Sequence, residues 1–339
     1  MRMLIVGAGT MTATIEGISA AGIAEEAMYY TPSADLEIVA YGNVTRAPTV
    51  PISPSGCPTP AVVTRAAREL VGFEVTALDA GLCRSTGAPT VSLGDQPGDD
   101  IRTDEPVANA AELFATARRF GKRLPDAGIF IGETIPGGTT TAMAVLTALG
   151  ERSGVSSSFA HNPLALKREV IDEALRASGL EAGNTAGEPI KTVRRVGDPM
   201  LGAVAGLIVG ATERGIDVTL AGGTQLAGAA ALARHAGVDA PLSLSTTSFV
   251  AADETAAIDG LAHDLELDLS ITDPAFQKRD HSAVNGYVTG EAKEGVGMGG
   301  ALAMLDGTDG TMSDLYERIT AVYDRLMAAD SASGRSLDS

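Results

Sequence analysis

The chain has 339 residues, of which 45% are hydrophobic and 20% are charged, so wholesale disorder is excluded and one large α/β domain or two modest ones can form. Asp and Glu number 43 against 25 Lys and Arg, giving a formal net charge of −18. This charge and an aromatic content of 4% argue against partners that are nucleic acids or anionic membranes.

Strand-like and helix-like segments alternate along almost the whole chain. Short β-rich runs predict strands at Met3–Val6, Glu37–Tyr41, Phe73–Leu78, Ala127–Ile131, Asp217–Ala221, Leu242–Thr247 and Leu265–Ile271. Amphipathic or Ala-rich stretches predict helices at 60–71, 106–123, 140–150, 164–178, 199–213, 224–236, 253–264 and 312–328. This order favours βαβ units in a doubly wound, mostly parallel, Rossmann-like α/β sheet. Ligands of such sheets bind beyond the carboxyl ends of the strands, so the loops that follow strands are the places to look for chemistry.

No linker divides the chain convincingly. We expect residues 1–329 to form a single α/β domain, to which both chain ends can contribute a small lobe, and residues 330–339 to form a disordered polar tail. The stretch Glu181–Pro189 predicts a surface loop. Without a run of 18 apolar residues or a signal-peptide pattern, the chain is expected to be cytoplasmic.

The charged residues and the cysteines indicate the solution conditions in which the protein works, but they say little about its reaction. Only five of the basic residues are Lys, and an acidic surface poor in Lys suits a protein kept soluble at high salt, so we expect a halophilic source. Cys57 and Cys83 form no CxxC pair, and the four His lack the spacing of metal ligands. We therefore expect no disulfide framework, no metal site and no cofactor.

The first glycine loop looks like the opening of a dinucleotide-binding unit. Gly7 and Gly9 follow a predicted strand, but Thr12 stands where the fingerprint needs a third glycine. Asp35 and Glu37 lie before or at the start of the second predicted strand, whereas the fingerprint needs an acid at its end. We expect no nicotinamide dinucleotide site here.

The strongest local signal is the run GETIPGGTTTA at 132–142, where a predicted strand leads through a glycine loop into a helix. Free N–H groups at a helix start bind anions, and three consecutive threonines exceed the single N-cap that a helix needs. No Lys follows the glycines, so the loop is not a P-loop. We predict a monophosphate site, with a plain capped helix as the alternative. Its residues are Glu133, Gly137, Gly138, Thr139, Thr140 and Thr141.

Three further turns lead into helices and can complete a phosphate site. Lys167 lies near a helix start after a serine-rich loop, and is either a phosphate partner or a solvated helix residue. Asp198 is either a ligand residue or a helix N-cap. The turn of Gly222, Gly223 and Thr224 either contacts the nucleotide or only connects a strand to a helix.

An acidic, glycine-rich loop precedes the last helix-forming runs. Glu291 and Glu294 are followed by Gly295 and Gly297, which we nominate as nucleotide-binding. A carboxylate beside glycines can reach a flat bound base, because no Cβ atoms crowd the approach. The alternative is a mobile surface loop whose acids are incidental.

Together these segments resemble the family of nicotinate-nucleotide–dimethylbenzimidazole phosphoribosyltransferases, most of all its divergent archaeal branch. The matching runs are GETIPGGTTTA (132–142), SSSFAHNPLALK (156–167), VGDPM (196–200), LAGGTQ (220–225) and KEGVGMGG (293–300). Weaker matches are GISAAG (17–22), PISPSGCPTPA (51–61) and PGDDIRT (97–103). Each run alone is weak, but their combined order is specific and spans nearly the whole chain.

The resemblance implies that ribose 5-phosphate moves from nicotinate mononucleotide to a benzimidazole-type base, releasing nicotinate, in cobalamin lower-ligand nucleotide synthesis. Glu294 then takes the role of catalytic base, although gapless alignment on the following ALAM would place the family's glutamate at Val296. Lys167 resembles the family's phosphate-contacting lysine. Ser55 and Gly56 are nominated, weakly, as base-binding residues.

The resemblance also implies a homodimer that uses only small-molecule substrates. Three other functions remain open: a non-catalytic nucleotide-binding or sensor protein, a dinucleotide-dependent oxidoreductase that uses Gly7–Thr12, and phosphoribosyl transfer to another acceptor such as adenine or a phenol.

Overall fold

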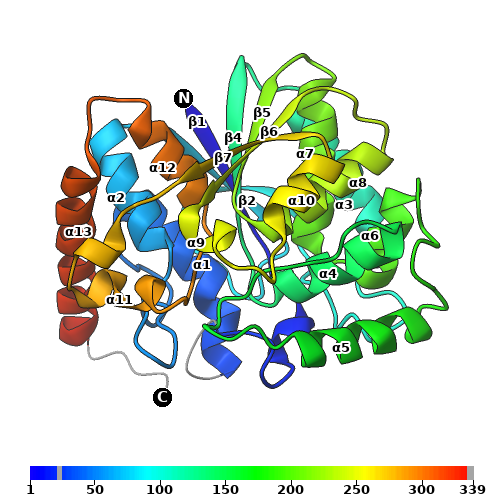
Figure 1. Cartoon of the computed structure of the whole chain (residues 1–339), viewed down its shortest axis with the longest axis horizontal. Helices are drawn as coiled ribbons and strands as arrows, with labels where there is room; N and C mark the ends of the chain where they lie inside the picture. Colours follow the sequence, from blue (N-terminus) through cyan, green and yellow to red (C-terminus); the bar gives the residue numbers. More distant parts are fainter. Residues whose placement is uncertain (21–24, 334–339) are drawn as a thin grey trace.

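The structure is a computed structural model that describes residues 1–20 and 25–333 (Figure 1). Its centre is a sheet of seven parallel strands in the order β3-β2-β1-β4-β5-β6-β7. The doubly wound, Rossmann-like α/β fold predicted from the sequence is therefore confirmed. The strands are β1 (Arg2–Gly7), β2 (Glu74–Ala80), β3 (Thr90–Gly94), β4 (Gly128–Thr134), β5 (Asp217–Ala221), β6 (Leu242–Thr247) and β7 (Leu267–Thr272).

Strand β1 shows why the centre of the sheet is covered on both sides. Its residues 3–6 are hydrophobic without alternation, and each is fully buried. Parallel strands covered by helices on both faces have this pattern. The strand lies between β2 and β4, at the point where the strand order changes direction.

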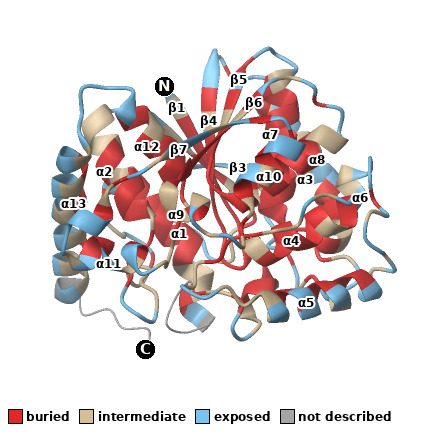
Figure 2. Ribbon diagram, viewed as in Figure 1, coloured by how far each residue is buried: buried red, intermediate tan, exposed pale blue. Residues whose placement is uncertain are grey.

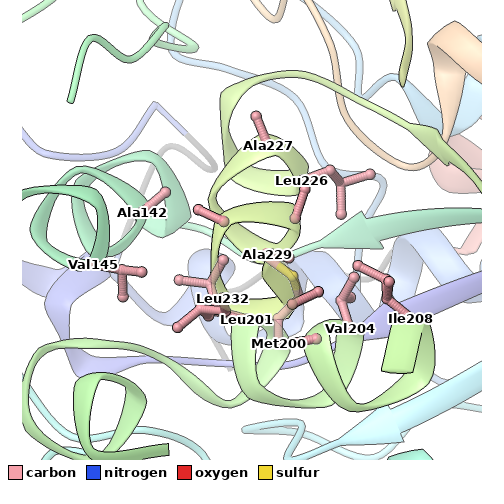
Figure 3. Close-up of a cluster of buried hydrophobic side chains, with 14 of the residues drawn as sticks. Ala142, Val145, Met200, Leu201, Val204, Ile208, Leu226, Ala227, Ala229 and Leu232 are labelled. Atoms are coloured by element: carbon pink, nitrogen blue, oxygen red, sulfur yellow. The ribbon is translucent and has the colours of Figure 1, made fainter. Parts of the chain in front are cut away.

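One face of the sheet, here called the α7 face, carries the helices of the middle of the chain (Figure 1). These helices are α3 (Ala110–Gly121), α4 (Gly138–Leu149), α5 (Leu164–Ala177), α6 (Pro189–Val196), α7 (Pro199–Thr212), α8 (Thr224–His235) and α10 (Ile258–Asp264). Helix α7 is apolar all round and buried from residue 199 to 211, as expected for a helix enclosed by other elements. Figure 3 shows α4, α7 and α8 packed together by Ala142, Val145, Met200, Leu201, Val204, Ile208, Leu226, Ala227, Ala229 and Leu232.

The other face, here called the α12 face, is built from both ends of the chain. Its helices are α1 (Glu25–Tyr41), α2 (Ala61–Val71), α11 (Ser282–Val288), α12 (Met298–Asp306) and α13 (Met312–Ser333). Helix α2 packs against α1, α12 and α13, and the layer shares its core with Met3 and Ile5 of β1. The chain ends therefore form a helix layer on the sheet and not the small separate lobe considered from the sequence. Figure 2 shows the outer surfaces of α5 and α13 exposed, and β1 at the centre of the sheet is buried from residue 3 to 7.

The predicted strand Glu37–Tyr41 is wrong, because these residues form the end of α1. Glu37 is buried, and its carboxylate accepts hydrogen bonds from the backbone N–H groups of Arg46 at 3.0 Å and Gly87 at 2.6 Å. These hydrogen bonds to residues beyond the helix override the local β propensity of Ile38 and Val39. The edge strand β3 was missed because only Leu93 of its five residues is buried, which leaves almost no hydrophobic pattern.

Several boundaries also differ. The predicted helix 253–264 is shorter and is preceded by a separate short helix, α9 (Ser248–Ala251). The short 3₁₀ helices are η1 (Met11–Thr14) and η2 (Phe276–Lys278). Helix α13 continues to Ser333, so the first residues of the predicted disordered tail are helical, and 334–339 lie outside the described residues. That 1–329 form a single domain stays a prediction. Of the described helices, none combines the length and apolarity needed to cross a membrane.

Candidate active site

A pocket of about 150 Å³ opens beyond the carboxyl end of β4, beside the point where the strand order changes direction. This is where ligands bind in doubly wound sheets. The lining comes from residues 18–20, 31, 35, 51–53, 57–60, 133–139, 156–158, 223–225, 250 and 292–296.

The glycine loop after β4 brings the start of α4 to this pocket. Gly137 has a φ of 77°, and a Cβ atom there would lie 2.9 Å from the Ala13 Cα, so only glycine fits. A Cβ atom on Gly138 would come within 2.2 Å of the Gln225 side chain. No side chain in the described part of the chain caps α4, which leaves its first N–H groups available to an anion.

The three threonines of this loop have different surroundings. Thr139 lines the pocket, whereas Thr140 and Thr141 are fully buried and do not. The Thr141 hydroxyl donates to Asp198 and to the Gly138 carbonyl oxygen, and the Thr140 hydroxyl has no hydrogen-bond partner among the described residues. The geometry therefore favours Thr139 as the hydroxyl that a ligand can reach, and the ligand contacts predicted for the other two stay predictions.

Lys167 lies behind the pocket wall. It is fully buried and absent from the lining, and its Nζ donates to the Thr139 Oγ1 at 3.0 Å and to the Ser156 carbonyl oxygen at 2.9 Å. Burial, followed by the charge of Lys293, lowers the pKa of Lys167 to about 7. The lysine thus holds two pocket loops together, and whether it also contacts a phosphate stays a prediction.

Asp198 and Gly222 lie outside the pocket lining. Asp198 is the N-cap of α7, where it accepts a hydrogen bond from the Leu201 N–H at 2.9 Å. Burial raises the pKa of Asp198 to about 6. A Cβ atom on Gly222 would lie 2.6 Å from the Leu226 side chain, as in a tight strand-to-helix turn. These placements favour the structural alternatives for both residues, while Gly223 and Thr224 do line the pocket.

Two glutamates line the pocket near the turn at Gly223, where a Cβ atom would lie 3.7 Å from the Glu294 Cγ. The Glu294 Oε1 accepts from the Gly299 N–H at 2.9 Å, and its buried Oε2 has no hydrogen-bond partner in the described ranges. The Glu133 Oε2 accepts from the Gln225 Nε2 at 3.2 Å. Burial raises the pKa of both carboxyls to about 8, and the nearby charge of Glu294 adds to the shift at Glu133.

The loop that carries Glu294 is anchored at several points. Its Val296 N–H donates to the Glu133 carbonyl oxygen at 2.7 Å, and the Val296 carbonyl oxygen accepts from the Thr64 hydroxyl at 2.9 Å. Glu291 is absent from the lining, and its carboxylate accepts from the hydroxyl of Ser53 at 3.0 Å. The loop therefore directs Glu294, and not Glu291, to the pocket, and its anchoring argues against incidental acids on a mobile surface loop.

Comparison with known proteins places the chain in a family. A sequence model of a phosphoribosyltransferase family matches residues 69–242. A UPF0284 protein of Halobacterium salinarum is 58% identical over 323 residues, covering 95% of this chain and 97% of the relative. Another, from Methanosarcina acetivorans, is 40% identical over 318 residues, covering 92% and 91%. The chain belongs to the nicotinate-nucleotide–dimethylbenzimidazole phosphoribosyltransferase family, in its archaeal UPF0284 branch.

Solved structures agree in fold. The nicotinate-nucleotide–dimethylbenzimidazole phosphoribosyltransferase from Thermus thermophilus is 18% identical, with a TM-score of 0.58, covering 93% of this chain and 82% of that chain. The structure titled CobT from the same organism is 17% identical, with a TM-score of 0.59, covering 95% and 83%. At this level of identity the likeness concerns the fold alone.

Several pocket residues of this phosphoribosyltransferase were not predicted from its sequence. Asp35 lines the pocket, and its carboxylate accepts from the hydroxyls of Thr59 and Thr134, both at 2.6 Å. Burial raises the pKa of Asp35 to about 6. Lys293 also lines the pocket, and its Nζ lies 2.8 Å from the Asp253 Oδ2. Lys293 opens the matching run KEGVGMGG and is one of only five Lys, but neither signal placed its side chain in the pocket, and Asp35 had no signal at all.

Other predicted residues lie near the pocket but outside its lining. Ser55 and Gly56 do not line it, although their neighbours Ser53 and Cys57 do. Gly295 lines it and Gly297 does not; a Cβ atom on Gly297 would lie 2.7 Å from the Met3 Sδ, which indicates a packing requirement.

The glycine loop after β1 is closed to a ligand at its second glycine. A Cβ atom on Gly9 would lie 2.2 Å from the Cys83 Sγ, so the backbone faces protein there. The short helix η1 follows in place of the long helix of a dinucleotide-binding unit. Across the described ranges, no group of three or more His, Cys, Asp or Glu side chains is arranged to hold a metal ion.

Proposed function

We propose that this protein moves ribose 5-phosphate from nicotinate mononucleotide to a benzimidazole-type base and releases nicotinate, within cobalamin lower-ligand nucleotide synthesis. The observation that carries the proposal is the set of polar side chains that line the pocket beyond β4. Hydroxyls, glycines and lysine contacts gather around Thr139 and Ser156, and carboxylates gather around Glu133 and Glu294. The first group suits a phosphate and the second suits a base that must lose a proton.

The phosphate occupies the glycine loop in this proposal. The uncapped start of α4, the Thr139 hydroxyl and the turn at Gly223 and Thr224 face the same pocket. Binding energy from the phosphate holds the ribose C1′ in line with the acceptor, which lowers the barrier without any contact at the reacting atoms. Lys167 supports this end through Thr139.

Glu294 is the catalytic base in this proposal. An imidazole nitrogen of the acceptor donates its lone pair to C1′ from the face opposite nicotinate, and the C1′–N bond of the donor breaks with its electron pair passing to the pyridine nitrogen. The positively charged pyridinium nitrogen becomes neutral as it takes up the pair, so nicotinate leaves without a protonating acid. The N–H proton on the other nitrogen of the acceptor passes to Glu294, whose Oε2 has no other partner among the described residues. General-base help of this type contributes about 10²–10⁴-fold.

The test is turnover of the purified protein with nicotinate mononucleotide and a panel of benzimidazoles, adenine and phenols, measured as nicotinate release and as α-riboside phosphate product. We expect Glu294→Gln to lower turnover by about a hundredfold or more while nucleotide binding is kept. Glu291→Gln is the matched control in the same loop, and a larger loss there would contradict the assignment. Binding of the nucleotide without turnover on any acceptor would favour a sensor protein. The homodimer stays a prediction.

A further inference from the structure

Lys293 is a nearly buried cation in the pocket wall. It is 7% exposed, and its Nζ donates to the Asp253 Oδ2 at 2.8 Å and to the Phe159 carbonyl oxygen at 3.2 Å. Taking a Lys–Asp pair out of water costs free energy that their attraction only partly returns, so such a pair is weak support for stability. Because the pair adds little stability and Lys293 lines the pocket, we expect its role to lie in ligand binding.

The pair continues into the hydroxyl end of the pocket. The Ser156 Oγ donates to the same Asp253 Oδ2 at 3.0 Å, and the Ser156 carbonyl oxygen accepts from Lys167 at 2.9 Å. Ser156 thus connects the Lys293–Asp253 pair to Lys167. The chain has a net charge of −18 and only five Lys, so two lysines this close to the glycine loop are unusual for its charge distribution.

The backbone holds Lys293 in place at some cost. Ala292 and Lys293 have φ values of 56° and 34°. These values lie in the left-handed region of the backbone, which residues other than glycine rarely adopt. The Lys293 carbonyl oxygen accepts from the Thr247 hydroxyl at 2.6 Å, and the Ala292 N–H donates to the Ser158 carbonyl oxygen at 3.0 Å. Left-handed residues of this kind persist where the surroundings impose them, often at binding sites.

We propose that Lys293 binds the phosphate of the nucleotide donor directly, while Lys167 supports Thr139 and Ser156 from behind the wall. This rests on the proposed function only in taking a phosphorylated nucleotide as the ligand. Because Glu294 follows Lys293 in the same constrained loop, the phosphate contact also sets the position of the catalytic carboxylate. Lys293 is therefore a positioning residue, through which phosphate binding contributes to the reaction step.

The binding test compares nicotinate mononucleotide with nicotinate riboside, which lacks the phosphate, by calorimetry. We expect Lys293→Met to weaken mononucleotide binding about tenfold or more, the range for loss of a charge-assisted hydrogen bond, and to leave riboside binding within about twofold. Lys191→Met is the control, since Lys191 is exposed and pairs with Glu188 on the surface. Equal losses for both ligands, or a loss for neither, would overturn the proposal.

Further variants keep the test informative if an unpaired Asp253 destabilises the fold. Lys293→Met combined with Asp253→Asn removes both charges, and we expect it to show the same selective loss. Lys293→Arg keeps the charge, and we expect it to retain most of the preference for the phosphorylated ligand. A double variant that binds the mononucleotide like the wild type would refute the assignment.

A kinetic experiment addresses the link to Glu294. Inorganic phosphite, added with nicotinate riboside as donor, is expected to raise kcat in the wild type and to have at least about tenfold less effect in Lys293→Met. Equal activation of both proteins would remove Lys293 from this role. If the wild type binds the mononucleotide but transfers nothing, the proposed function fails, and the ratio of the two affinities still decides for or against Lys293. If the wild type binds neither ligand, both proposals fail.

Discussion

Replacing Glu133 by Gln should stabilise the ligand-free protein at neutral pH. Glu133 is 4% exposed, and burial followed by the charge of Glu294 raises its pKa from 4.5 to about 8. Between these two values the folded state binds more protons than the unfolded state, so the free energy of unfolding falls as pH rises. The cost is absent below pH 4.5 and complete above about 8.

The size of the effect follows from the same shift. Each pH unit in this window corresponds to about 1.4 kcal/mol, so the cost at pH 7 is at most about 3.5 kcal/mol. Glu133→Gln keeps the shape of the side chain and its contact with Gln225 while removing the ionisable group. We expect the variant to gain about 1–3 kcal/mol over the wild type at pH 7, and almost nothing at pH 5.

The assay is urea unfolding of the wild type and the variant from pH 5 to pH 8 at constant, high ionic strength. Glu181→Gln is the control, because Glu181 is exposed on a surface loop. Parallel pH profiles for the wild type and Glu133→Gln would refute the reasoning, since they would mean that Glu133 ionises in the pocket without cost.

Three further predictions concern the lysine, the metal and the salt. Lys167→Met should lower nucleotide affinity about tenfold or more, measured by calorimetry against Lys191→Met, and unchanged affinity would show that the buried lysine serves only the fold. A chelator should leave turnover unchanged, because nicotinate leaves from a pyridinium donor as a neutral pyridine and needs no Lewis acid; a loss restored by Mg²⁺ would contradict this. The melting temperature should rise between roughly 0.01 M and 1 M potassium chloride, as the Debye length falls from about 30 to 3 Å. A flat series in chloride and in sulfate would remove the inference of a halophilic source.

The parts of the fold that carry a dense apolar pattern were predictable. Strand residues 3–6 and the Ala-rich helices could be recognised in the sequence. Elements that are buried on both sides need continuous hydrophobic residues, and such runs stand out. The edge strand β3 lacks that pattern, and the segment of α1 after Leu36 combines strand-like residues with a helical environment. Local propensity cannot resolve such segments, because the deciding contacts come from distant parts of the chain.

The candidate site was predictable only where local chemistry is distinctive. Glycines and hydroxyls before a helix indicate an anion site, and the pocket does contain Gly137 and Thr139. Which lysine faces the ligand depends on the direction of each side chain, so Lys167 was nominated and Lys293 was not. Asp35 was missed for the same reason, since its partners lie 24 and 99 residues away in the chain.

The helix layer built from both chain ends has a consequence for how the protein is made. Met3 and Ile5 are synthesised well before α12 and α13, which contribute to the same hydrophobic core. During synthesis one face of the sheet therefore presents apolar side chains, and such partly covered intermediates are prone to aggregate. The pocket wall at residues 292–296 also arrives late, so a nascent chain cannot bind its ligand early for protection. Production of soluble protein should depend on how quickly α12 and α13 dock, and a deletion of α13, which packs against α2, should yield insoluble material rather than a weaker enzyme.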